Sequence, residues 1–438
     1  MQSEDELIAE ALSAARDTKQ LLLGQGVLAQ TPAVFAATFP GRSAVIVADP
    51  RTDRAAGERV RAAFQASATA LPDRFLFDAP QLYAEHRYVV RLQERLSASD
   101  LIPIAVGSGT INDVTKLAAH RVNRPYLCVA TAASMDGYTA YGASITHNGS
   151  KQTFDCPAPR AVVADLDVIA QAPAEMNAWG YADLLAKFTA GADWILADEL
   201  GVEPIDPLAW RMVQARLPDW TSEPQGVKRG DRAAIRSLMC GLLMSGFAMQ
   251  ATQSSRVASG AEHQFSHLWD MQQATDASHG AKVGVATVAV ARLYDSILKH
   301  ARWDAGAPAE PSSLTAGAFP TTIDELFATE PAIAAKAKLE TTAKHWTADT
   351  FTRLRDRWPA IQQRVRSYLP TSGKIVSMLT SVGAPTRPDQ IGISRQRLHD
   401  SFIRAYHIRR RFTVLDVAVR TGILESCLAE MEEQDVDA

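Results

Sequence analysis

Cysteine is scarce in this chain, and its few cysteines lie far apart. The 438 residues include four, Cys128, Cys156, Cys240 and Cys427, and none belongs to a C-x-x-C pair. This spacing indicates neither a disulfide framework nor a thiolate zinc site. We therefore expect a protein of the reducing cytoplasm.

Excess charge and long apolar segments are also missing. A formal net charge of -4, with an isoelectric point near 6.2, gives no general attraction to nucleic acid or to an anionic membrane. The longest nearly continuous apolar run, Leu238 to Met249, is too short to cross a bilayer and predicts a buried helix. Residues 1–20 are acidic and amphipathic, unlike a signal peptide. We expect no nucleic-acid partner and no membrane insertion.

The first part of the chain alternates strand and helix patterns. Short apolar runs, rich in β-branched residues, are followed by helical patterns, an order typical of an open parallel sheet. These runs begin near residues 42, 75, 101, 125 and 160. From Ala174 onward the strand signal disappears and helical patterning takes over. The length also suggests two domains, and we predict an α/β domain over 1–173 and an all-helical domain over 174–438.

A glycine turn follows the strand that begins near residue 101. It consists of Gly107, Ser108 and Gly109, and it leads into a predicted helix. Such a turn can approach a pyrophosphate, while the helix start offers free N–H groups. A plain tight turn is the alternative, because Asn112 stands where a strict G-x-G-x-x-G motif has its last glycine.

Polar residues end two further strands. Thr131, Ser134 and Asp136 follow the strand that begins near residue 125, at the edge where parallel sheets bind ligands. Asp136 precedes a glycine, so stabilisation of a turn is its alternative role. Asp49 ends the strand AVIVADP, where a carboxylate can bind the ribose hydroxyls of NAD and repel a 2′-phosphate. A proline follows Asp49, so the start of a turn is again the alternative.

The most informative stretch is Ser259 to Gly284, which holds three of the ten histidines. His263 and His267 are four residues apart in a helical pattern, so we expect them on one face. His279 begins the next segment. A helix with one or two imidazoles, together with a third imidazole from the next segment, is typical of a divalent-metal site that leaves coordination positions open for substrate. Ordinary polar residues of an amphipathic helix are the alternative.

Asp183 is the best source of a carboxylate for such a site, because it lies in a segment with helical periodicity. Lys187 follows one turn later, and Lys282 lies three residues after His279. These lysines are the cations closest in sequence to the proposed ligands and could hold an anionic end of a substrate. Surface charge is the alternative for each. One carboxylate and two imidazoles accept zinc, nickel or ferrous iron.

Two further segments predict surface structure. Residues 302–322 are rich in Ala, Gly, Pro and Ser and predict a loop. Arg409, Arg410 and Arg411 would point in different directions on a helix, so we predict a solvated or interface helix end rather than one basic patch.

The chain resembles the superfamily of glycerol dehydrogenases, iron-containing alcohol dehydrogenases and dehydroquinate synthases in four motifs that occur in order. These are GSGTINDVTK, VATAASMDGYTA, GYADLLAK and SGAEHQFSH…SHGAKVGVAT. Within the superfamily, the likeness is closest to bacterial sn-glycerol-1-phosphate dehydrogenases and covers nearly the whole chain. The resemblance implies a dehydroquinate synthase-like fold: a nucleotide-binding α/β domain, an all-α domain and an active site in the cleft between them.

The resemblance also implies roles for individual residues. The matched metal ligands are Asp183, His263 and His279. The matched nicotinamide-cofactor loop contains Gly107, Ser108, Gly109 and Asp113, and the matched cofactor and substrate loop contains Thr131, Ser134 and Asp136. Lys187 stands where iron-dependent alcohol dehydrogenases have a further histidine ligand, which leaves room for two substrate oxygens. His267 matches a position close to the substrate and is a candidate proton shuttle.

The implied activity is a metal-dependent dehydrogenase, linked to NAD or NADP, that interconverts sn-glycerol 1-phosphate and dihydroxyacetone phosphate. Alternatives on the same fold are a glycerol or other polyol dehydrogenase and a dehydroquinate-synthase-like lyase. A metallohydrolase is disfavoured because the H-E-x-x-H glutamate is missing, and a non-catalytic nucleotide-binding protein would leave the metal ligands idle. We expect one divalent ion, a small phosphorylated substrate and a homo-oligomer.

Overall fold

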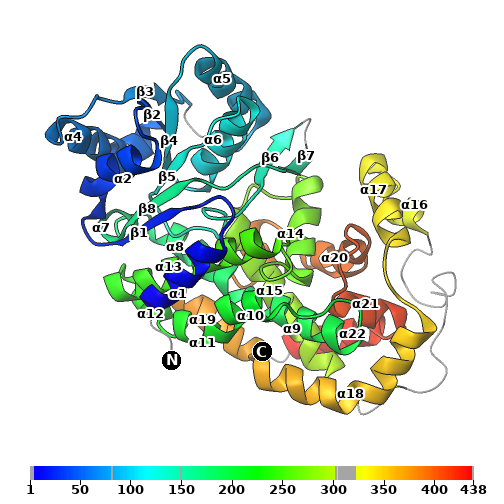
Figure 1. The fold of residues 1–438 in the computed structure, drawn as a ribbon. Coiled ribbons are helices and arrows are strands. Elements are labelled where there is room, and N and C mark those ends of the chain that lie inside the picture. Colours follow the sequence, from blue (N-terminus) through cyan, green and yellow to red (C-terminus); the bar gives the residue numbers. More distant parts are fainter. Residues whose placement is uncertain (1–3, 80–81, 148–149, 301–302, 304–321, 437–438) are drawn as a thin grey trace. The chain divides into compact units, whose positions relative to one another are not determined.

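The computed structural model of the chain contains two compact units (Figure 1). It describes residues 4–79, 82–147, 150–300, 303 and 322–436, so most of the predicted loop 302–322 lies outside the described residues. The first unit comprises Met1–Leu184, Leu208–Ser255 and Ser381–Gly383, and the second Leu185–Pro207, Arg256–Thr380 and Ala384–Ala438. The predicted division at 173/174, between a nucleotide-binding and a metal-binding domain, stays a prediction.

The first unit is built on a six-stranded parallel sheet with the strand order β1-β8-β5-β4-β2-β3. Its strands are β1 Gln20–Gly24, β2 Ala44–Ala48, β3 Asp73–Leu76, β4 Ile102–Gly107, β5 Leu127–Ala130 and β8 Ala161–Asp165. Every residue of β2, β4, β5 and β8 is buried. Strands covered on both faces need continuous apolar runs, which is the pattern that the sequence showed. The predicted α/β architecture is therefore confirmed.

Helices precede, connect and follow these strands. They are α1 Glu4–Ala14, α2 Thr31–Thr38, α3 Pro50–Thr52, α4 Glu58–Ala66, α5 His86–Ser97, α6 Gly109–Arg121 and α7 Leu166–Ile169, with a 3-10 turn at Val27–Gln30 and a π-helical turn at Asp53–Gly57. Phe35 of α2 and Phe64 of α4 meet edge to face, with ring centroids 5.8 Å apart, in a core that includes Ile46 and Ile104 of the sheet. Burial of these aromatic and aliphatic side chains holds the helices on the sheet.

The sequence prediction missed β1 and an antiparallel hairpin formed by β6 Ala143–His147 and β7 Ser150–Phe154. β1 is short and has no β-branched residue. The hairpin strands, ASITH and SKQTF, contain too many polar residues to stand out as apolar runs.

Further helices complete the first unit. They are α8 Ala174–Leu185, α10 Pro207–Met212, α11 Leu217–Trp220, α12 Pro224–Lys228 and α13 Arg232–Thr252, with a 3-10 turn at Gln214–Arg216. α13 contains the run Leu238 to Met249, and all of it is buried as predicted. Among the described residues, α13 is the one helix long and apolar enough to cross a membrane, but 83% of its most apolar window is buried inside the structure.

Helices are the regular secondary structure of the second unit, and no strand occurs among its described residues, which confirms the predicted helical C-terminal region. Its helices are α9 Lys187–Glu199, α14 Ala261–Met271, α15 His279–Ile297, α16 Ile323–Leu326, α17 Pro331–Thr342, α18 Ala348–Tyr368, most of α19 Ser372–Val382, α20 Arg395–His407, α21 Val414–Arg420 and α22 Leu424–Val436, with a 3-10 turn at Pro388–Ile391. Phe265 and Trp269 of α14 pack edge to face, and Phe265 also meets Phe402 of α20 with ring centroids 4.9 Å apart. α14 is thereby held in the core of this unit.

Candidate functional site

Asp183 lies in α8 and is fully buried. Its Oδ2 accepts a hydrogen bond from the backbone N–H of Asp136 at 3.1 Å. The carboxylate of Asp136 in turn accepts a hydrogen bond from Ser245 Oγ of α13 at 2.8 Å. The loop after β5 therefore connects a predicted substrate residue to a predicted metal ligand.

The same loop packs closely against α8. A Cβ atom at Gly180 would lie 1.8 Å from the carbonyl oxygen of Ala133, so only glycine allows this approach. Asn177 Oδ1 accepts a hydrogen bond from the N–H of Ala133 at 3.1 Å. These contacts satisfy buried backbone groups and hold the loop in one position.

His263 is the third residue of α14, whose start is tightly packed. The N–H of Ala261 donates to Asp193 Oδ2 at 2.7 Å, which satisfies one of the free donors at the helix start. A Cβ atom at Gly260 would lie 2.5 Å from the same oxygen and 2.8 Å from Ala190 Cα. Only glycine fits there, and the position of His263 depends on this packing.

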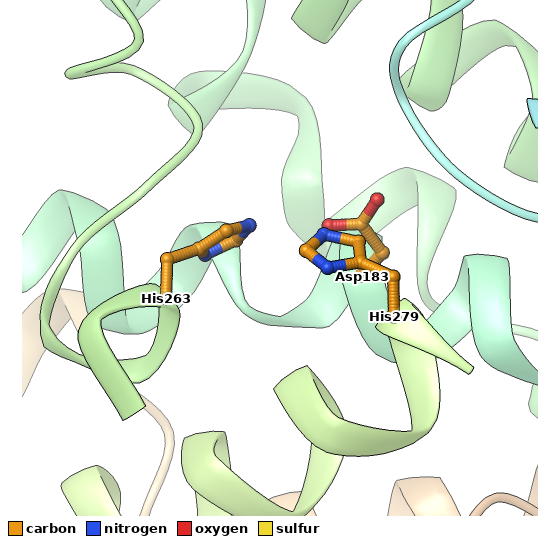
Figure 2. Close-up of side chains that lie close together, drawn as sticks. All are labelled: Asp183, His263 and His279. Atoms are coloured by element: carbon orange, nitrogen blue, oxygen red, sulfur yellow. The ribbon is translucent and has the colours of Figure 1, made fainter. Parts of the chain in front are cut away.

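His279 is the first residue of α15, and Ser278 caps that helix by accepting a hydrogen bond from the N–H of Ala281. The His263 and His279 ring centroids are 5.3 Å apart. Figure 2 shows these imidazoles and the carboxylate of Asp183 directed toward a common space, and one ligand atom from each lies within 4.8 Å of the others. One carboxylate and two imidazoles suit a divalent transition metal and leave coordination positions open.

His267, the predicted proton shuttle, lies one turn after His263 in α14, with ring centroids 6.2 Å apart. Burial, followed by the positive charge of Arg409, lowers the pKa of His267 well below its ordinary value. The imidazole is therefore neutral at neutral pH.

Glu262 is a residue that the sequence analysis missed. It is fully buried, and its Oε1 lies 2.8 Å from Nδ1 of His263. Its only signal in the sequence is its place directly before a predicted ligand, where an acidic residue is also common as a favourable charge in the first turn of a helix.

The prediction of a helix end at Arg409 to Arg411 is wrong. These arginines follow α20 outside any helix. Arg409 donates to Ser259 Oγ at 2.9 Å and Arg411 to the Ser259 carbonyl oxygen at 2.6 Å, whereas Arg410 pairs with Glu340. In an extended segment, alternate residues point to the same side, which a helical arrangement does not allow. Two of the arginines therefore hold the segment just before α14.

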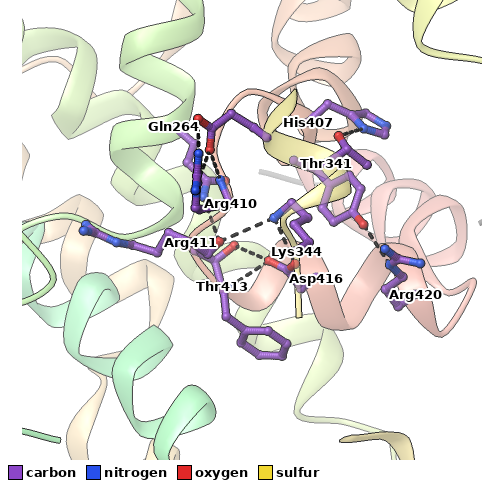
Figure 3. Close-up of polar contacts among 12 residues, drawn as sticks. Gln264, Thr341, Lys344, His407, Arg410, Arg411, Thr413, Asp416 and Arg420 are labelled. Carbon is purple, nitrogen blue, oxygen red and sulfur yellow. Dashed lines mark hydrogen bonds and ion pairs between the residues drawn. The ribbon is translucent and has the colours of Figure 1, made fainter. Parts of the chain in front are cut away.

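A buried ion pair anchors this arginine segment (Figure 3). Lys344 Nζ lies 2.9 Å from Asp416 Oδ1 and 4.4 Å from the centre of the Tyr406 ring. Lys344 also donates to the carbonyl oxygen of Arg411, and Asp416 accepts a hydrogen bond from the N–H of Thr413 at 2.9 Å. The pair thus fixes the backbone at the C-terminal end of the arginine segment.

The two predicted phosphate lysines lie in different surroundings. Lys187 is the first residue of α9 and is fully buried, and its carbonyl oxygen accepts a hydrogen bond from the Tyr368 hydroxyl. Lys282 lies in the first turn of α15 and forms an ion pair with Asp270 of α14. Because Asp270 already balances its charge, Lys282 attracts a further anion less strongly.

The predicted cofactor turn lies at the carboxyl ends of neighbouring parallel strands, where ligands bind in such sheets. Gly107 ends β4, Ser108 precedes α6, and Gly109 begins that helix. A Cβ atom at Gly107 would lie 2.5 Å from Cβ of Ile111, so the turn requires glycine. At the end of β5, the N–H of Thr131 donates to the Gly107 carbonyl oxygen. Ser134 lies three residues further in the same loop and is partly exposed.

Asp113 and Asp49 both make structural contacts. Asp113 Oδ2 accepts a hydrogen bond from the N–H of Ser144, and burial raises the pKa of Asp113 although Lys116 lowers it. Asp49 Oδ1 accepts a hydrogen bond from the N–H of Thr52 at 2.9 Å and caps α3. The turn role that the sequence allowed for Asp49 is therefore present.

Lys116 is another residue that the sequence analysis missed. Its buried Nζ donates to the carbonyl oxygens of Gly137, Ala140 and Gly142 at 2.8 to 3.1 Å. Three donors of one ammonium group are thus used to shape the loop that follows Asp136.

Comparisons with known proteins show which sequences this chain is similar to. A family model described as iron-containing alcohol dehydrogenase matches residues 22–173. A relative from Geobacillus stearothermophilus, named glycerol-1-phosphate dehydrogenase (NAD(P)+), is 33% identical over 337 residues, which are 76% of this chain and 75% of the relative. A relative of the same name from Bacillus subtilis is 31% identical over 382 residues, 85% of this chain and 84% of the relative.

Solved structures share the fold. The crystal structure of a probable glycerol dehydrogenase from Sinorhizobium meliloti matches with a TM-score of 0.61 and 16% identity over 95% of this chain and 98% of that one. A sulfoacetaldehyde reductase from Bifidobacterium kashiwanohense, in complex with NAD+, matches with a TM-score of 0.60 and 14% identity, over 94% and 97%.

Proposed function

Because the chain belongs to the glycerol-1-phosphate dehydrogenase family, we propose that it is a metal-dependent dehydrogenase that interconverts sn-glycerol 1-phosphate and dihydroxyacetone phosphate with NAD or NADP. The observation that carries this proposal is the cluster of Asp183, His263 and His279, whose ligand atoms lie within 4.8 Å of one another. The proposed substrate is inferred from the name of the relatives.

The donor set fits one divalent ion, zinc, nickel or iron. Asp183 is fully buried and His263 is 6% exposed, and a buried carboxylate needs a compensating charge. Three protein ligands also leave positions for two substrate oxygens. When bound, the ion supplies Lewis-acid polarisation of the substrate oxygens, and the nicotinamide supplies or accepts the hydride.

We assign proton transfer to His267 and substrate orientation to Asp136. The lowered pKa keeps His267 neutral, and the neutral imidazole is the form that can take up the proton of a hydroxyl group. Asp136 is anchored through its N–H to Asp183 and through its carboxylate to Ser245. A residue fixed at both ends can orient a substrate without losing freedom on binding.

The substrate phosphate needs a cation, and Lys187 or Lys282 is our candidate. Lys187 is a buried lysine one turn after Asp183. Lys282 follows His279 in α15, although Asp270 already compensates its charge. A fixed ammonium group can bind a phosphate oxygen through a charge-assisted hydrogen bond.

For the cofactor, we propose the turn Gly107 to Gly109 with Asp113, Thr131 and Ser134, and Asp49 near the adenosine ribose. Asp49 would repel the 2′-phosphate of NADP, so we expect NADH to be preferred over NADPH. Steady-state kinetics with both cofactors check this preference, and faster turnover with NADPH would remove the ribose role of Asp49. The capping of α3 would then be its whole function.

Cofactor reduction measured with sn-glycerol 1-phosphate, glycerol, sn-glycerol 3-phosphate or no substrate tests the activity. We expect reduction with sn-glycerol 1-phosphate alone at low substrate concentration. Equal or faster turnover of glycerol would favour the polyol dehydrogenase, and equal turnover of both phosphate enantiomers would exclude the proposed stereochemistry.

We further propose a cytoplasmic homo-oligomer. All four cysteines are free and buried, which suits a reducing compartment. Light scattering of the purified protein gives the subunit number, and a monomer under assay conditions would refute the oligomer.

A further inference from the structure

We propose that Glu262 is a positioning residue for the metal ligand His263 and fixes the imidazole so that its Nε2 faces the metal. This inference rests on the metal site of the proposed function and is independent of the substrate.

The carboxylate of Glu262 is surrounded by hydrogen-bond donors. Oε1 accepts a hydrogen bond from the N–H of Gly260 at 2.6 Å and lies 2.8 Å from Nδ1 of His263. Oε2 accepts a hydrogen bond from the Thr189 hydroxyl of α9 at 2.7 Å. Because Glu262 is fully buried, these contacts and not solvent determine its orientation.

The contact to His263 selects one tautomer of the imidazole. An ionised carboxylate can only accept hydrogen bonds, so the hydrogen of the neutral ring must be on Nδ1. The lone pair of Nε2 is then available to a metal ion. A carboxylate that accepts from the other ring nitrogen of a ligand histidine fixes the ring orientation and makes the ligand more basic.

The neighbouring residues keep Glu262 in place. A Cβ atom at Gly260 would lie 2.9 Å from Glu262 Oε2, so any larger residue would push the carboxylate away. Thr189 connects the other side of the carboxylate to α9. Neighbouring side chains on a helix do not normally face each other. The contact between Glu262 and His263 therefore depends on the packing at Gly260 and on the hydrogen bond from Thr189.

Zn²⁺ affinity, measured by competition with a chromophoric chelator, tests this role. We expect Glu262→Ala to weaken Zn²⁺ binding by about 10–100-fold. In Glu262→Gln, the side-chain oxygen can still accept from Nδ1, so we expect a smaller loss. This partial rescue distinguishes orientation of the ring from simple filling of space. If the alanine variant folds poorly, the Zn²⁺ affinity of the glutamine variant can still be compared with that of the wild type.

Glu199→Gln is the matched control. It also replaces a mostly buried carboxylate by an amide in the second unit, and its partners are Arg357 and Arg364 rather than a histidine. We expect lower thermal stability with unchanged Zn²⁺ affinity. Imidazole nitrogen NMR shifts of the metal-free proteins add a direct readout. His263 should carry its hydrogen on Nδ1 in the wild type and should populate both tautomers in Glu262→Ala.

Unchanged Zn²⁺ affinity in both Glu262 variants, or an unchanged tautomer in Glu262→Ala, would overturn the inference. A wild-type protein that binds neither Zn²⁺ nor Ni²⁺ would overturn the metal site together with it. Zn²⁺ binding that depends on Glu262, without turnover of sn-glycerol 1-phosphate, would refute only the proposed activity.

Discussion

The backbone N–H of Asp136 donates a hydrogen bond to the carboxylate of Asp183, and this bond joins the loop after β5 to a proposed metal ligand. Ser245 of α13 extends the connection, because its hydroxyl donates to the Asp136 carboxylate. The ligand, the loop and a long buried helix are therefore linked by two hydrogen bonds. A substitution of Ser245 in α13 should therefore affect the position of the Asp183 carboxylate.

We expect Ser245→Ala to lower the free energy of unfolding by about 1.5 kcal/mol, because a partly buried hydrogen bond to a charged group is lost. The same substitution should reduce kcat/KM, since the loop that carries Asp136 loses one anchor. Urea unfolding and steady-state kinetics measure the two effects. Ser237→Ala in the same helix is the control, because Ser237 is only partly buried, and equal losses in both variants would contradict the role of the Ser245 contact.

The proposed metal ligands lead to a second prediction. His263→Ala and His279→Ala should each lose most of the bound ion and the activity, because each removes one of three protein donors. Both should also unfold at lower temperature than the wild type, since metal binding stabilises the folded state. Metal analysis and thermal unfolding check this, with the exposed His120→Ala as control. Full occupancy in either ligand variant would refute the assignment.

The sequence predicted those parts of the fold and site that have a local pattern. Buried strands such as β2 and β4 are continuous apolar runs, and His263 and His267 lie at helical spacing. Asp183 was found because it lies in a helical segment that also matches a family motif. In these cases, neighbouring residues contain the information that determines the structure.

The rest depends on contacts between distant parts of the chain. The sequence predicted no convergence for Arg409 and Arg411, because their common partner Ser259 is about 150 residues away. Glu262 looks like an ordinary acid of a first helical turn until Thr189 and the packing around it are known. The polar strands of the β6–β7 hairpin are stabilised by pairing with each other, which composition does not reveal.

From the burial of His407 we predict that the protein loses stability in acid. This histidine is buried beside Lys344 and Arg420, and burial together with these charges lowers the pKa of His407 from 6.5 to about 3. Between these two pH values, the unfolded chain binds a proton that the folded chain does not. Acid therefore favours unfolding, by about 1.4 kcal/mol per pH unit below pH 6.5.

Chemical unfolding of the wild type and of His407→Gln over this pH range measures the effect. The wild type should lose stability relative to the variant as the pH falls, and the difference should be constant above pH 7. His345→Gln, which changes an exposed histidine nearby, should follow the wild type. Parallel curves for the wild type and His407→Gln would show that this histidine titrates normally in the folded protein.

The last prediction separates the two candidate phosphate lysines. Lys187→Met should lower kcat/KM for sn-glycerol 1-phosphate by some tens-fold, because a charge-assisted hydrogen bond to a phosphate is worth about 2 kcal/mol. Residual activity on glycerol, which has no phosphate, should hardly change.

Lys282→Met removes the ion-pair partner of the mostly buried Asp270 carboxylate, so it should reduce stability and both activities together. Adding Asp270→Asn to Lys282→Met removes the unpaired charge and isolates any contact of Lys282 with phosphate. If glycerol 1-phosphate and glycerol turnover fell equally in Lys187→Met and in the Lys282 and Asp270 double variant, neither lysine would bind phosphate. A wild-type preference for glycerol would, in that case, identify a polyol dehydrogenase on the same fold.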